Sequence, residues 1–302
     1  MKLKNKLLSI VFMIFIVIGA LTGCSQKTQV MKDREGNEFK LPKKVDTIIS
    51  TAPSNTEVLV ELGLGDKLVA IDKYSKDVKG VNKEAKKIDF RTPDVETIVS
   101  LKPDIVIASG HNRDGNEDPF SEVKEAGIEV VYIPSSSSIE GIYDDIKFIS
   151  KVTDTEKKGN EIVSDMKKEI KSMKEIGDKI KGKKSVYFEI GSTPSLFTFG
   201  KDTFLNEMIE VIGGENIFKN QKSWLTVNSE SVIKANPDVI FTSEPKKDAL
   251  KSIKTRTGWQ NIKAVKNNNV YYIDKNYSSR PSNNIIKALK EMSKDIYKDK
   301  HE

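Results

Sequence analysis

Apolar residues fall in short continuous runs along the chain, and stretches with helical spacing separate one run from the next. Runs without polar alternation are typical of strands that are covered on both faces in a parallel sheet. Seven of them stand at residues 47–51, 68–71, 105–108, 130–133, 186–190, 239–242 and 270–273. Because four runs precede a long polar stretch and three follow it, the pattern predicts an α/β fold with two Rossmann-like lobes and mostly parallel sheets.

The stretch between the two sets of runs is poor in Gly and Pro. Its apolar residues recur every three or four positions among Lys and Glu, at Ile162, Met166, Ile170, Met173, Ile176 and Ile180. This spacing predicts one long amphipathic helix whose apolar stripe faces the core. We therefore expect an N-terminal lobe at 45–153, a connecting helix at 154–181 and a C-terminal lobe at 182–302. A single stiff connection indicates a binding protein with a limited hinge.

The first residues have the pattern of a signal peptide, expected over 1–23. Three lysines precede an uncharged run at 7–21, which is shorter than the roughly 20 residues of a membrane-spanning helix. The run ends in Leu-Thr-Gly-Cys, which resembles a lipobox, so we expect Cys24 to carry a lipid. The polar residues 24–44 would then form a tether. The alternative is a buried structural cysteine beside a transmembrane helix.

Composition removes several classes of protein. The chain has 50 Lys and Arg against 44 Asp and Glu, a formal net charge of +6. The expected signal peptide contains three lysines and no acid, so 47 basic and 44 acidic residues remain after its removal. This near balance argues against nucleic acid as a partner. One cysteine excludes a disulfide framework within the chain, and with only two histidines we expect no metal site.

An internal repeat relates the two lobes. Residues 95–106 match residues 229–240: in each, a Glu begins a short helix, and Pro-Asp follows seven and eight residues later, before a buried strand. A weaker pair, 61–65 and 211–215, carries glycines that would end a helix. The repeat predicts two lobes of like design.

Together these motifs resemble the class III substrate-binding lipoproteins that feed ABC importers for cobalamin, ferric siderophores and haem. The resemblance extends from about residue 45 to the C-terminus. It rests on the lipobox, the Pro-Ser-Asn-Thr-Glu at 53–57, the two Glu-x6-Pro-Asp units, residues 213–218 and Arg280-Pro281. It implies a ligand cleft between lobes that one long helix bridges. It also implies a lipid anchor on the extracytoplasmic face of a bacterial cell membrane. We expect the bacterium to be Gram-positive.

The acids of the repeat acquire a role from this resemblance. In the family, one Glu on each lobe docks onto Arg residues of the two permease subunits, and the matching positions are Glu96 and Glu230. A charge-assisted contact on each lobe fixes orientation on a two-fold partner better than one contact could. As first-turn acids, both would also offset a helix dipole. That role accounts for either Glu alone, but it does not explain why both lobes carry a Glu at the same position.

Within the family the chain is most similar to the cobalamin binders. We therefore expect cobalamin or another corrinoid as the ligand, and no cofactor. The resemblance places Tyr74, Phe90 and Trp224 at the cleft, and Phe197 or Phe199 would add a wall from the second lobe. Large flat side chains suit the broad face of a corrinoid. Each of these aromatic residues could instead belong to the core.

Two arginines at the cleft edge, Arg91 and Arg280, favour another ligand. A pair of cations suits a carboxylate-rich siderophore or the propionates of haem, which therefore stay open as the alternative. The cobalamin binders also carry an Arg that matches Arg280, so this residue discriminates little. The loop from Tyr277 to Arg280 could bond to either kind of ligand. His111 could ligate haem iron or the metal of a corrinoid, but we interpret it as a loop residue. We interpret Trp259 as part of the packing.

The chain lacks the usual signatures of an enzyme. It has no G-x-S-x-G nucleophile elbow, no G-x-x-x-x-G-K-[ST] phosphate loop and no G-x-G-x-x-G after a strand. Glu57 and Glu61 lie one helical turn apart, and we interpret them as a solvated helix face rather than as a pair of catalytic acids. The sequence therefore predicts a binding protein, with no catalytic residue.

Overall fold

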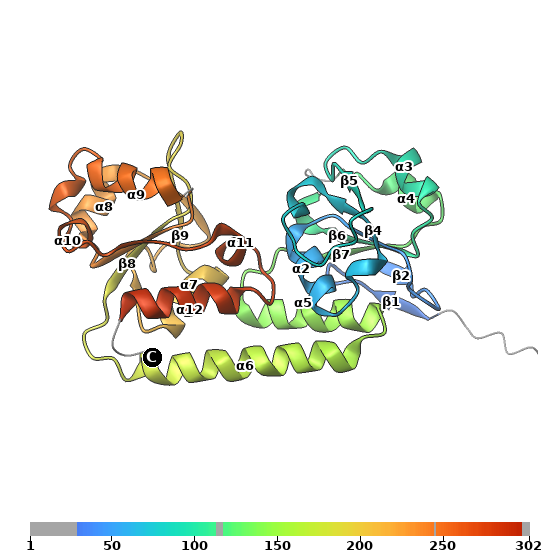
Figure 1. The fold of residues 1–302 in the computed structure, drawn as a ribbon, viewed down its shortest axis with the longest axis horizontal. Helices are drawn as coiled ribbons and strands as arrows, with labels where there is room; N and C mark the ends of the chain where they lie inside the picture. Colours follow the sequence, from blue (N-terminus) through green and yellow to red (C-terminus); the bar gives the residue numbers. More distant parts are fainter. Residues whose placement is uncertain (1–28, 113–116, 245, 298–302) are drawn as a thin grey trace, which may run out of the picture.

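Two lobes stand side by side, and a long helix runs beneath both of them in the computed structural model (Figure 1). The structure describes residues 29–112, 117–244 and 246–297. The expected signal peptide and Cys24 lie outside these residues. The α/β class, the two lobes and the mostly parallel sheets that the sequence predicts are confirmed.

The N-terminal lobe contains a five-stranded sheet in which every neighbouring pair of strands is parallel, in the order β5-β4-β3-β6-β7. The strands are β3 (Ile48–Ser50), β4 (Leu68–Asp72), β5 (Lys86–Ile88), β6 (Ile105–Ser109) and β7 (Val130–Ile133). Four of them coincide with predicted apolar runs. The fifth, β5, escapes the apolar pattern because two of its three residues are lysines at the sheet edge.

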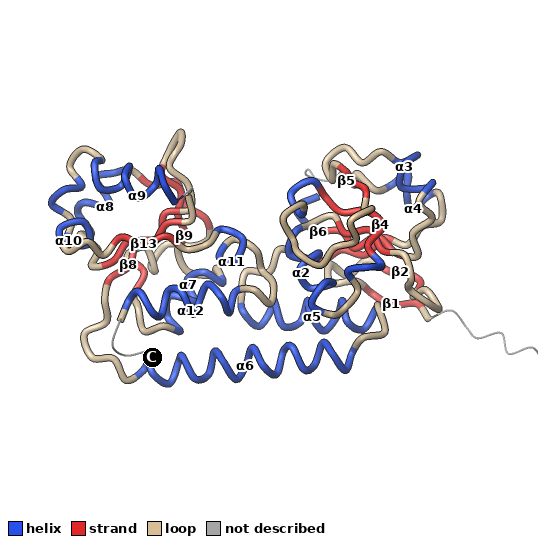
Figure 2. Tube along the Cα trace, viewed as in Figure 1, coloured by secondary structure: helices blue, strands red, loops and turns tan. Residues whose placement is uncertain are grey.

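Helices cover both faces of this sheet, as its unbroken apolar strands require (Figure 2). Successive residues of β6 show the division. Ile105 and Ile107 join the core shared with α2 and α5, whereas Val106 packs in the cluster that contains residues of α3 and α4. These helices are α2 (Pro53–Glu61), α3 (Val95–Ser100), α4 (Ser121–Glu125) and α5 (Ile139–Val152).

The C-terminal lobe repeats this plan with a four-stranded parallel sheet in the order β10-β8-β12-β13. Its strands are β8 (Ser185–Glu189), β10 (Glu215–Asn216), β12 (Val239–Thr242) and β13 (Val270–Tyr272). An antiparallel ribbon of β9 (Leu196–Phe199) and β11 (Trp224–Val227) stands beside the sheet. The three runs predicted for this lobe are therefore strands, and the ribbon is an addition that the apolar pattern does not predict.

Helices again lie on both sides of the sheet (Figure 2). One cluster of buried residues includes α7 and α12, and the other includes α8, α9 and α10. The helices of this lobe are α7 (Phe204–Val211), α8 (Ser229–Ala235), α9 (Lys246–Thr255), α10 (Lys263–Lys266), α11 (Lys275–Ser278) and α12 (Ile285–Ile296). Short 3-10 turns in the two lobes are η1 (Gly65–Lys67), η2 (Lys73–Ser75), η3 (Gly110–Asn112) and η4 (Trp259–Asn261). Trp259 is fully buried, so its interpretation as packing is confirmed.

The connecting helix is α6 (Glu156–Asp178), within the predicted range of 154–181. Ile162, Met166 and Met173 are buried along one face, as the amphipathic spacing predicts. Near its end, α6 comes so close to the end of α7 that a methyl group on Gly177 would lie 2.5 Å from the carbonyl oxygen of Val211. A methyl group on Gly159, near the start of α6, would likewise collide with Ser150 of α5, so the helix packs tightly on both lobes.

The prediction of a tether over 24–44 is wrong for its folded part. Residues in this range form an antiparallel hairpin, β1 (Val30–Lys32) and β2 (Glu38–Lys40), packed on the N-terminal lobe. Phe39 is buried, and the Arg34 guanidinium bonds to the Asp145 carboxylate at 2.8 Å. Such short strands carry too few apolar residues for the sequence pattern to distinguish them from a linker.

Candidate functional site

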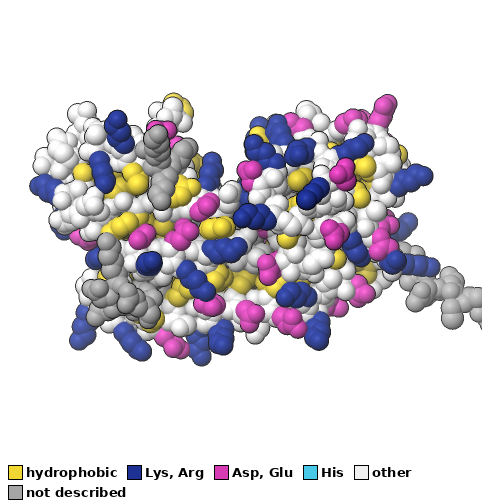
Figure 3. All heavy atoms as spheres, viewed as in Figure 1, with side chains coloured by type: hydrophobic (Ala, Val, Ile, Leu, Met, Phe, Trp, Pro, Cys, Tyr) yellow, Lys and Arg dark blue, Asp and Glu magenta, His cyan; other side chains and the backbone are white. Residues whose placement is uncertain are grey.

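A cavity of about 260 Å³ lies between the lobes, where the carboxyl ends of several parallel strands meet. In open α/β sheets this edge is the usual place for a ligand. The N-terminal lobe contributes Thr51, Ala52, Pro53, Ser54, Tyr74, Phe90, Ser109, Asn112 and Ser135, and the C-terminal lobe contributes Ser279, Arg280 and Pro281. We call this set the cleft cavity. A notch opens between the lobes on the side away from α6 (Figure 3).

Tyr74 and Phe90 form an aromatic wall on the N-terminal lobe. Their ring centroids are 6.0 Å apart, and Tyr74 is 53% exposed. Tyr74 is held in place because its backbone N–H donates to the carboxylate of buried Asp72 at 2.8 Å. A large exposed aromatic residue at a cavity is typical of a binding surface. The structure thus brings together two of the residues that the resemblance implied.

A second aromatic wall lies on the ribbon of the C-terminal lobe. Phe197 and Trp224 stack with ring centroids 6.3 Å apart and planes 17° from parallel, and they are 39% and 45% exposed. Phe199 does not line a wall. It is fully buried, and it contacts Phe188 at 5.6 Å and the Trp224 ring edge-on at 6.3 Å. The expectation of Phe199 as a wall residue is therefore wrong: it supports Trp224 from the core.

Arg280 makes a contact between the lobes that the sequence does not indicate. Its Nη1 donates to Glu57 Oε1 at 2.7 Å, and its Nη2 donates to the Tyr74 carbonyl oxygen at 3.3 Å. The other oxygen of Glu57 accepts from Ser282 Oγ at 2.5 Å. We call Glu57, Arg280 and Ser282 the inter-lobe clasp. Glu57 is only 6% exposed, so its interpretation as part of a solvated face is wrong, whereas Glu61 is exposed.

The other two polar candidates lie apart from the cleft cavity. Arg91 is exposed and places its guanidinium 5.6 Å from the centroid of Phe90. It does not form a pair of free cations with Arg280, because Arg280 is bound to Glu57. Tyr277 lines a separate groove of about 480 Å³ beyond the clasp, where the Lys287 ammonium lies 5.0 Å from its ring. The side chain of His111 lies outside the described part of the chain.

Glu96 and Glu230 occupy the same position in the two lobes. Each is an exposed acid in the first turn of a short helix, α3 or α8. Each helix has its own cap: Asp94 accepts from the Thr97 N–H at 3.2 Å, and Asn228 accepts from the Ser231 N–H at 2.8 Å. Both helices lie on the upper parts of the lobes, away from α6 (Figure 1). The two carboxylates are therefore available to a partner that faces both lobes.

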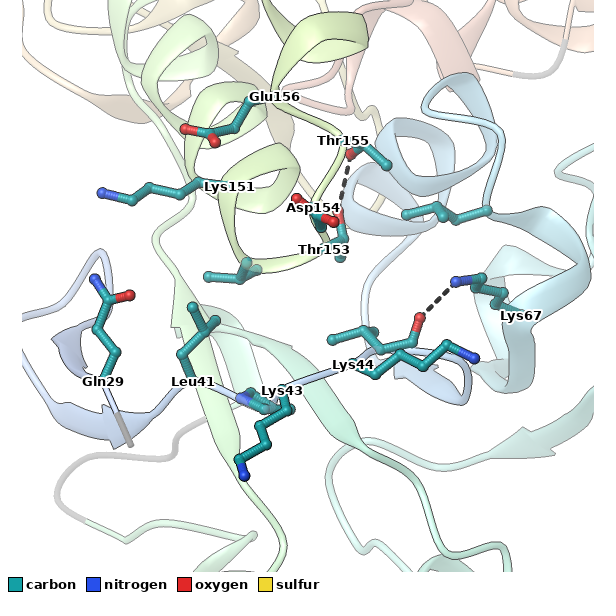
Figure 4. Close-up of a pocket in the computed structure, with 14 residues that line it drawn as sticks. Gln29, Leu41, Lys43, Lys44, Lys67, Lys151, Thr153, Asp154, Thr155 and Glu156 are labelled. Carbon is teal, nitrogen blue, oxygen red and sulfur yellow. Dashed lines mark hydrogen bonds between the residues drawn. The ribbon is translucent and has the colours of Figure 1, made fainter. Parts of the chain in front are cut away.

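A larger pocket of about 520 Å³ lies at the foot of the N-terminal lobe, where the first hairpin meets the turn between α5 and α6 (Figure 4). Lys43, Lys44, Lys67 and Lys151 line it. Two of these lysines are engaged, because Lys44 and Lys67 form ion pairs with Asp46. The pocket belongs to one lobe and lacks exposed aromatic residues, so it is a poorer candidate for a ligand than the cleft cavity.

Neither a metal centre nor a membrane-spanning helix is found among the described residues. No group of three or more His, Cys, Asp or Glu side chains there could hold a metal ion. Among the same residues, no helix combines the length and the apolar character needed to cross a bilayer.

Comparison with known proteins identifies the fold family. A family model described as periplasmic binding protein matches residues 48–277, which is most of the chain. The chain belongs to this family. The resemblance to class III substrate-binding proteins is thereby confirmed, and so is the prediction of a binding protein rather than an enzyme.

Individual relatives cover nearly the whole chain. An uncharacterized ABC transporter substrate-binding lipoprotein, YvrC of Bacillus subtilis, is 35% identical over 91% of this chain and 88% of its own. The vitamin B12-binding protein of Vibrio parahaemolyticus is 28% identical over 82% of this chain and 88% of its own. A crystal structure of a possible iron-binding protein from Staphylococcus epidermidis aligns with a TM-score of 0.75 and 36% identity, over 84% of this chain and all of that one.

Proposed function

We propose that this protein is the lipid-anchored, extracytoplasmic substrate-binding subunit of an ABC importer and that it binds a corrinoid such as cobalamin. The observation that carries the ligand class is the pair of aromatic walls, Tyr74 with Phe90 on one lobe and Phe197 with Trp224 on the other. Broad apolar rings that stay exposed in the free protein suit a large flat ligand. The similarity to a vitamin B12-binding protein supports the same class.

The dimensions of the site agree with a ligand that is only partly enclosed. The cleft cavity measures about 260 Å³, which is at or below the ~300–1,000 Å³ of most small-molecule sites. A corrinoid would place one edge in the cavity and its bulk in the notch between the aromatic walls. Modest rotation of the lobes about α6 would then bring the walls onto its two sides.

The remaining parts of the proposal follow the family. Cys24 would carry the lipid that holds the protein on the outer face of a Gram-positive cell membrane, a placement that the lipoprotein relative from Bacillus supports. Glu96 and Glu230 would dock onto arginines of the permease dimer, and their exposed, equivalent positions support that role.

A second ligand class is supported by a different observation. The crystal structure from Staphylococcus epidermidis, at 36% identity, is described as that of a possible iron-binding protein. The alternative ligand is therefore a ferric siderophore or haem, which the same aromatic walls could contact.

Absorption spectroscopy distinguishes the two classes. The purified protein is mixed with cyanocobalamin, haem or a ferric siderophore and separated from free ligand by gel filtration. We expect the spectrum of cobalamin to travel with the protein and to disappear in the Tyr74→Ala, Trp224→Ala double variant. If the protein retained haem or siderophore but not cobalamin, the proposed ligand would be wrong and the importer would serve iron uptake.

A further inference from the structure

The floor of the cleft cavity is polar but almost uncharged. Of the twelve residues that line it, Arg280 alone has a charged side chain. The polar side chains belong to Thr51, Ser54, Tyr74, Ser109, Asn112, Ser135 and Ser279 besides Arg280. Hydroxyl and amide groups of this kind bond to neutral donors and acceptors as readily as to ions. The charge of the floor therefore depends on the state of Arg280.

Acids on the N-terminal lobe offset the charge of Arg280. The Glu57 carboxylate is 2.7 Å from Arg280 Nη1, and its other oxygen is taken by Ser282. Both partners are largely buried, with side-chain exposures of 15% for Arg280 and 5% for Glu57. Asp72, fully buried beside Tyr74, contributes less: burial raises the pKa of its carboxyl, and the attraction of Arg280 opposes that rise. The guanidinium reaches the cavity with its charge already compensated.

One hydroxyl next to the clasp is left for a ligand. Ser279 Oγ is buried and has no hydrogen-bond partner among the described residues. A buried hydroxyl without a partner costs free energy, so a ligand atom that bonds to it gains from satisfying it. Ser279 and Arg280 both line the cleft cavity, so a ligand that bonds to Ser279 shares this cavity with the compensated guanidinium.

We infer that Glu57 is a specificity-determining residue, which by neutralising Arg280 makes the cleft select a ligand whose inner fringe consists of neutral amide or hydroxyl groups. A carboxylate on that fringe would lose water on entering the cavity. The guanidinium of Arg280, with which a carboxylate would normally pair, is already bound to Glu57. The carboxylate of Glu57 would also repel the carboxylate of the ligand. This inference rests on the proposed function in assuming a macrocyclic ligand in this cleft.

The test compares ligands that differ only in the charge of their fringe. One pair is cyanocobalamin and its monocarboxylic acids, in which one propionamide is replaced by a propionate. The second pair is the dimethyl ester of iron protoporphyrin IX and the free acid. Calorimetry gives the ratio of the two dissociation constants within each pair. For the wild-type protein we expect the neutral member to bind at least about tenfold tighter, in the pair whose macrocycle fits the cleft.

Glu57→Gln keeps an oxygen for Arg280 and removes the compensating charge. We expect it to lower the ratio by about tenfold, mainly by strengthening binding of the acid. Glu61→Gln is the matched control, because Glu61 lies one turn further along α2, is exposed and accepts a long hydrogen bond from Asn283 Nδ2 at 3.5 Å. This control should keep the wild-type ratio within about twofold. Thermal melting of each variant shows whether it is folded.

A double variant, Glu57→Gln with Arg280→Gln, keeps the inference testable if the single change unfolds the protein. It removes both charges, so the preference for the neutral member should persist while both affinities fall by a similar factor. Equal affinities of the wild-type protein for the neutral and acidic members would overturn the inference and leave the proposed function intact. So would a ratio that Glu57→Gln does not change. Failure of the wild-type protein to bind all of these macrocycles would overturn the proposed function and the inference together.

Discussion

Asp238 makes in the C-terminal lobe the contacts that Asp104 makes in the N-terminal lobe. The Asp104 carboxylate accepts from the N–H and the hydroxyl of Thr47, both at 2.9 Å. The Asp238 carboxylate accepts from the N–H and the hydroxyl of Ser185, at 3.0 and 2.7 Å. In each lobe the aspartate of the Pro-Asp turn thus fixes the residue that leads into the neighbouring strand of the sheet. We call this contact, Asp104 with Thr47 or Asp238 with Ser185, the joint of the lobe. The internal repeat of the sequence therefore reflects a repeated structural contact.

Loss of the joint should destabilise either lobe. We expect Asp104→Ala and Asp238→Ala each to lower the free energy of unfolding by about 1–3 kcal/mol, because strand-entry donors lose their acceptor. Urea unfolding followed by circular dichroism measures the change. Asp66→Ala, on the exposed turn η1, is the control and should be near neutral. If both aspartate variants had the same free energy of unfolding as that control, these contacts would not stabilise the lobes.

Stability should also fall with rising pH because of Asp145. Burial raises the pKa of this carboxyl to about 6, against the opposing effect of its bonds from Ser136 and Arg34. An acid whose pKa is higher in the folded than in the unfolded state favours the folded state at low pH. That contribution is lost as pH rises from about 4 to about 6. The size is on the order of 2–3 kcal/mol.

Asp145→Asn removes this titration and keeps an acceptor for Arg34. We expect the variant to gain stability relative to the wild-type protein between pH 4.5 and 7, as measured by urea unfolding across that range. A difference that stays constant with pH would show that Asp145 does not titrate there.

Fluorescence reports on the aromatic wall of the C-terminal lobe. The chain has two tryptophans, and Trp259 is fully buried whereas Trp224 is 45% exposed. Cobalamin should therefore quench the emission of Trp224, and Trp224→Ala should weaken binding by about 1–3 kcal/mol. Val99→Ala, an exposed apolar residue outside the cleft cavity, should leave affinity unchanged. Unaltered emission at saturating cobalamin would place the ligand away from the ribbon.

Uptake tests the docking carboxylates. Glu96→Ala with Glu230→Ala should keep the melting temperature and ligand affinity, since exposed carboxylates contribute little to stability. Docking should lose roughly 2–5 kcal/mol, so import into cells should cease. The control replaces two other exposed first-turn acids, Glu122 and Glu156, and should import normally. Normal import by the Glu96 and Glu230 variant would refute docking through these residues.

Cell fractionation tests the anchor. Cys24→Ala should leave the protein without lipid and release it from membranes, because each buried methylene of a lipid contributes about 0.8 kcal/mol. Immunoblots of membrane and soluble fractions after a carbonate wash measure the distribution. A variant that stays in the membrane fraction would indicate that the segment spans the bilayer.

Sequence patterns predict those parts of the fold in which apolar residues are continuous. The seven buried strands are of this kind. The helix α6 was predictable from apolar residues that recur every three or four positions, and two helix ends were predictable from glycine: Gly63 and Gly213 both have positive φ after a helix. The hairpin of β1 and β2 escapes prediction because short strands with one buried residue, Phe39, leave no periodic signal.

Single residues of the candidate site could be predicted from the sequence, but their arrangement in space could not. The resemblance supplied Tyr74 and Trp224, but their separation into two walls depends on the position of the ribbon. Glu57 was misinterpreted because its partner Arg280 is 223 positions away and belongs to the other lobe. Phe199 was misplaced because it and Phe197 are two positions apart on one strand, and only the packing of Trp224 shows which ring is covered.

The largest core cluster is continuous from Phe39 in the first hairpin to Ile296 in the last helix, and residues of α6 belong to it. We therefore expect that neither lobe folds on its own. A chain cut after Lys181 would leave two fragments that each expose an apolar seam to water, and reassociation of the halves would be needed to recover a native core. Although the lobes repeat one design, we expect them to unfold as a single cooperative unit, so that heating gives one calorimetric transition.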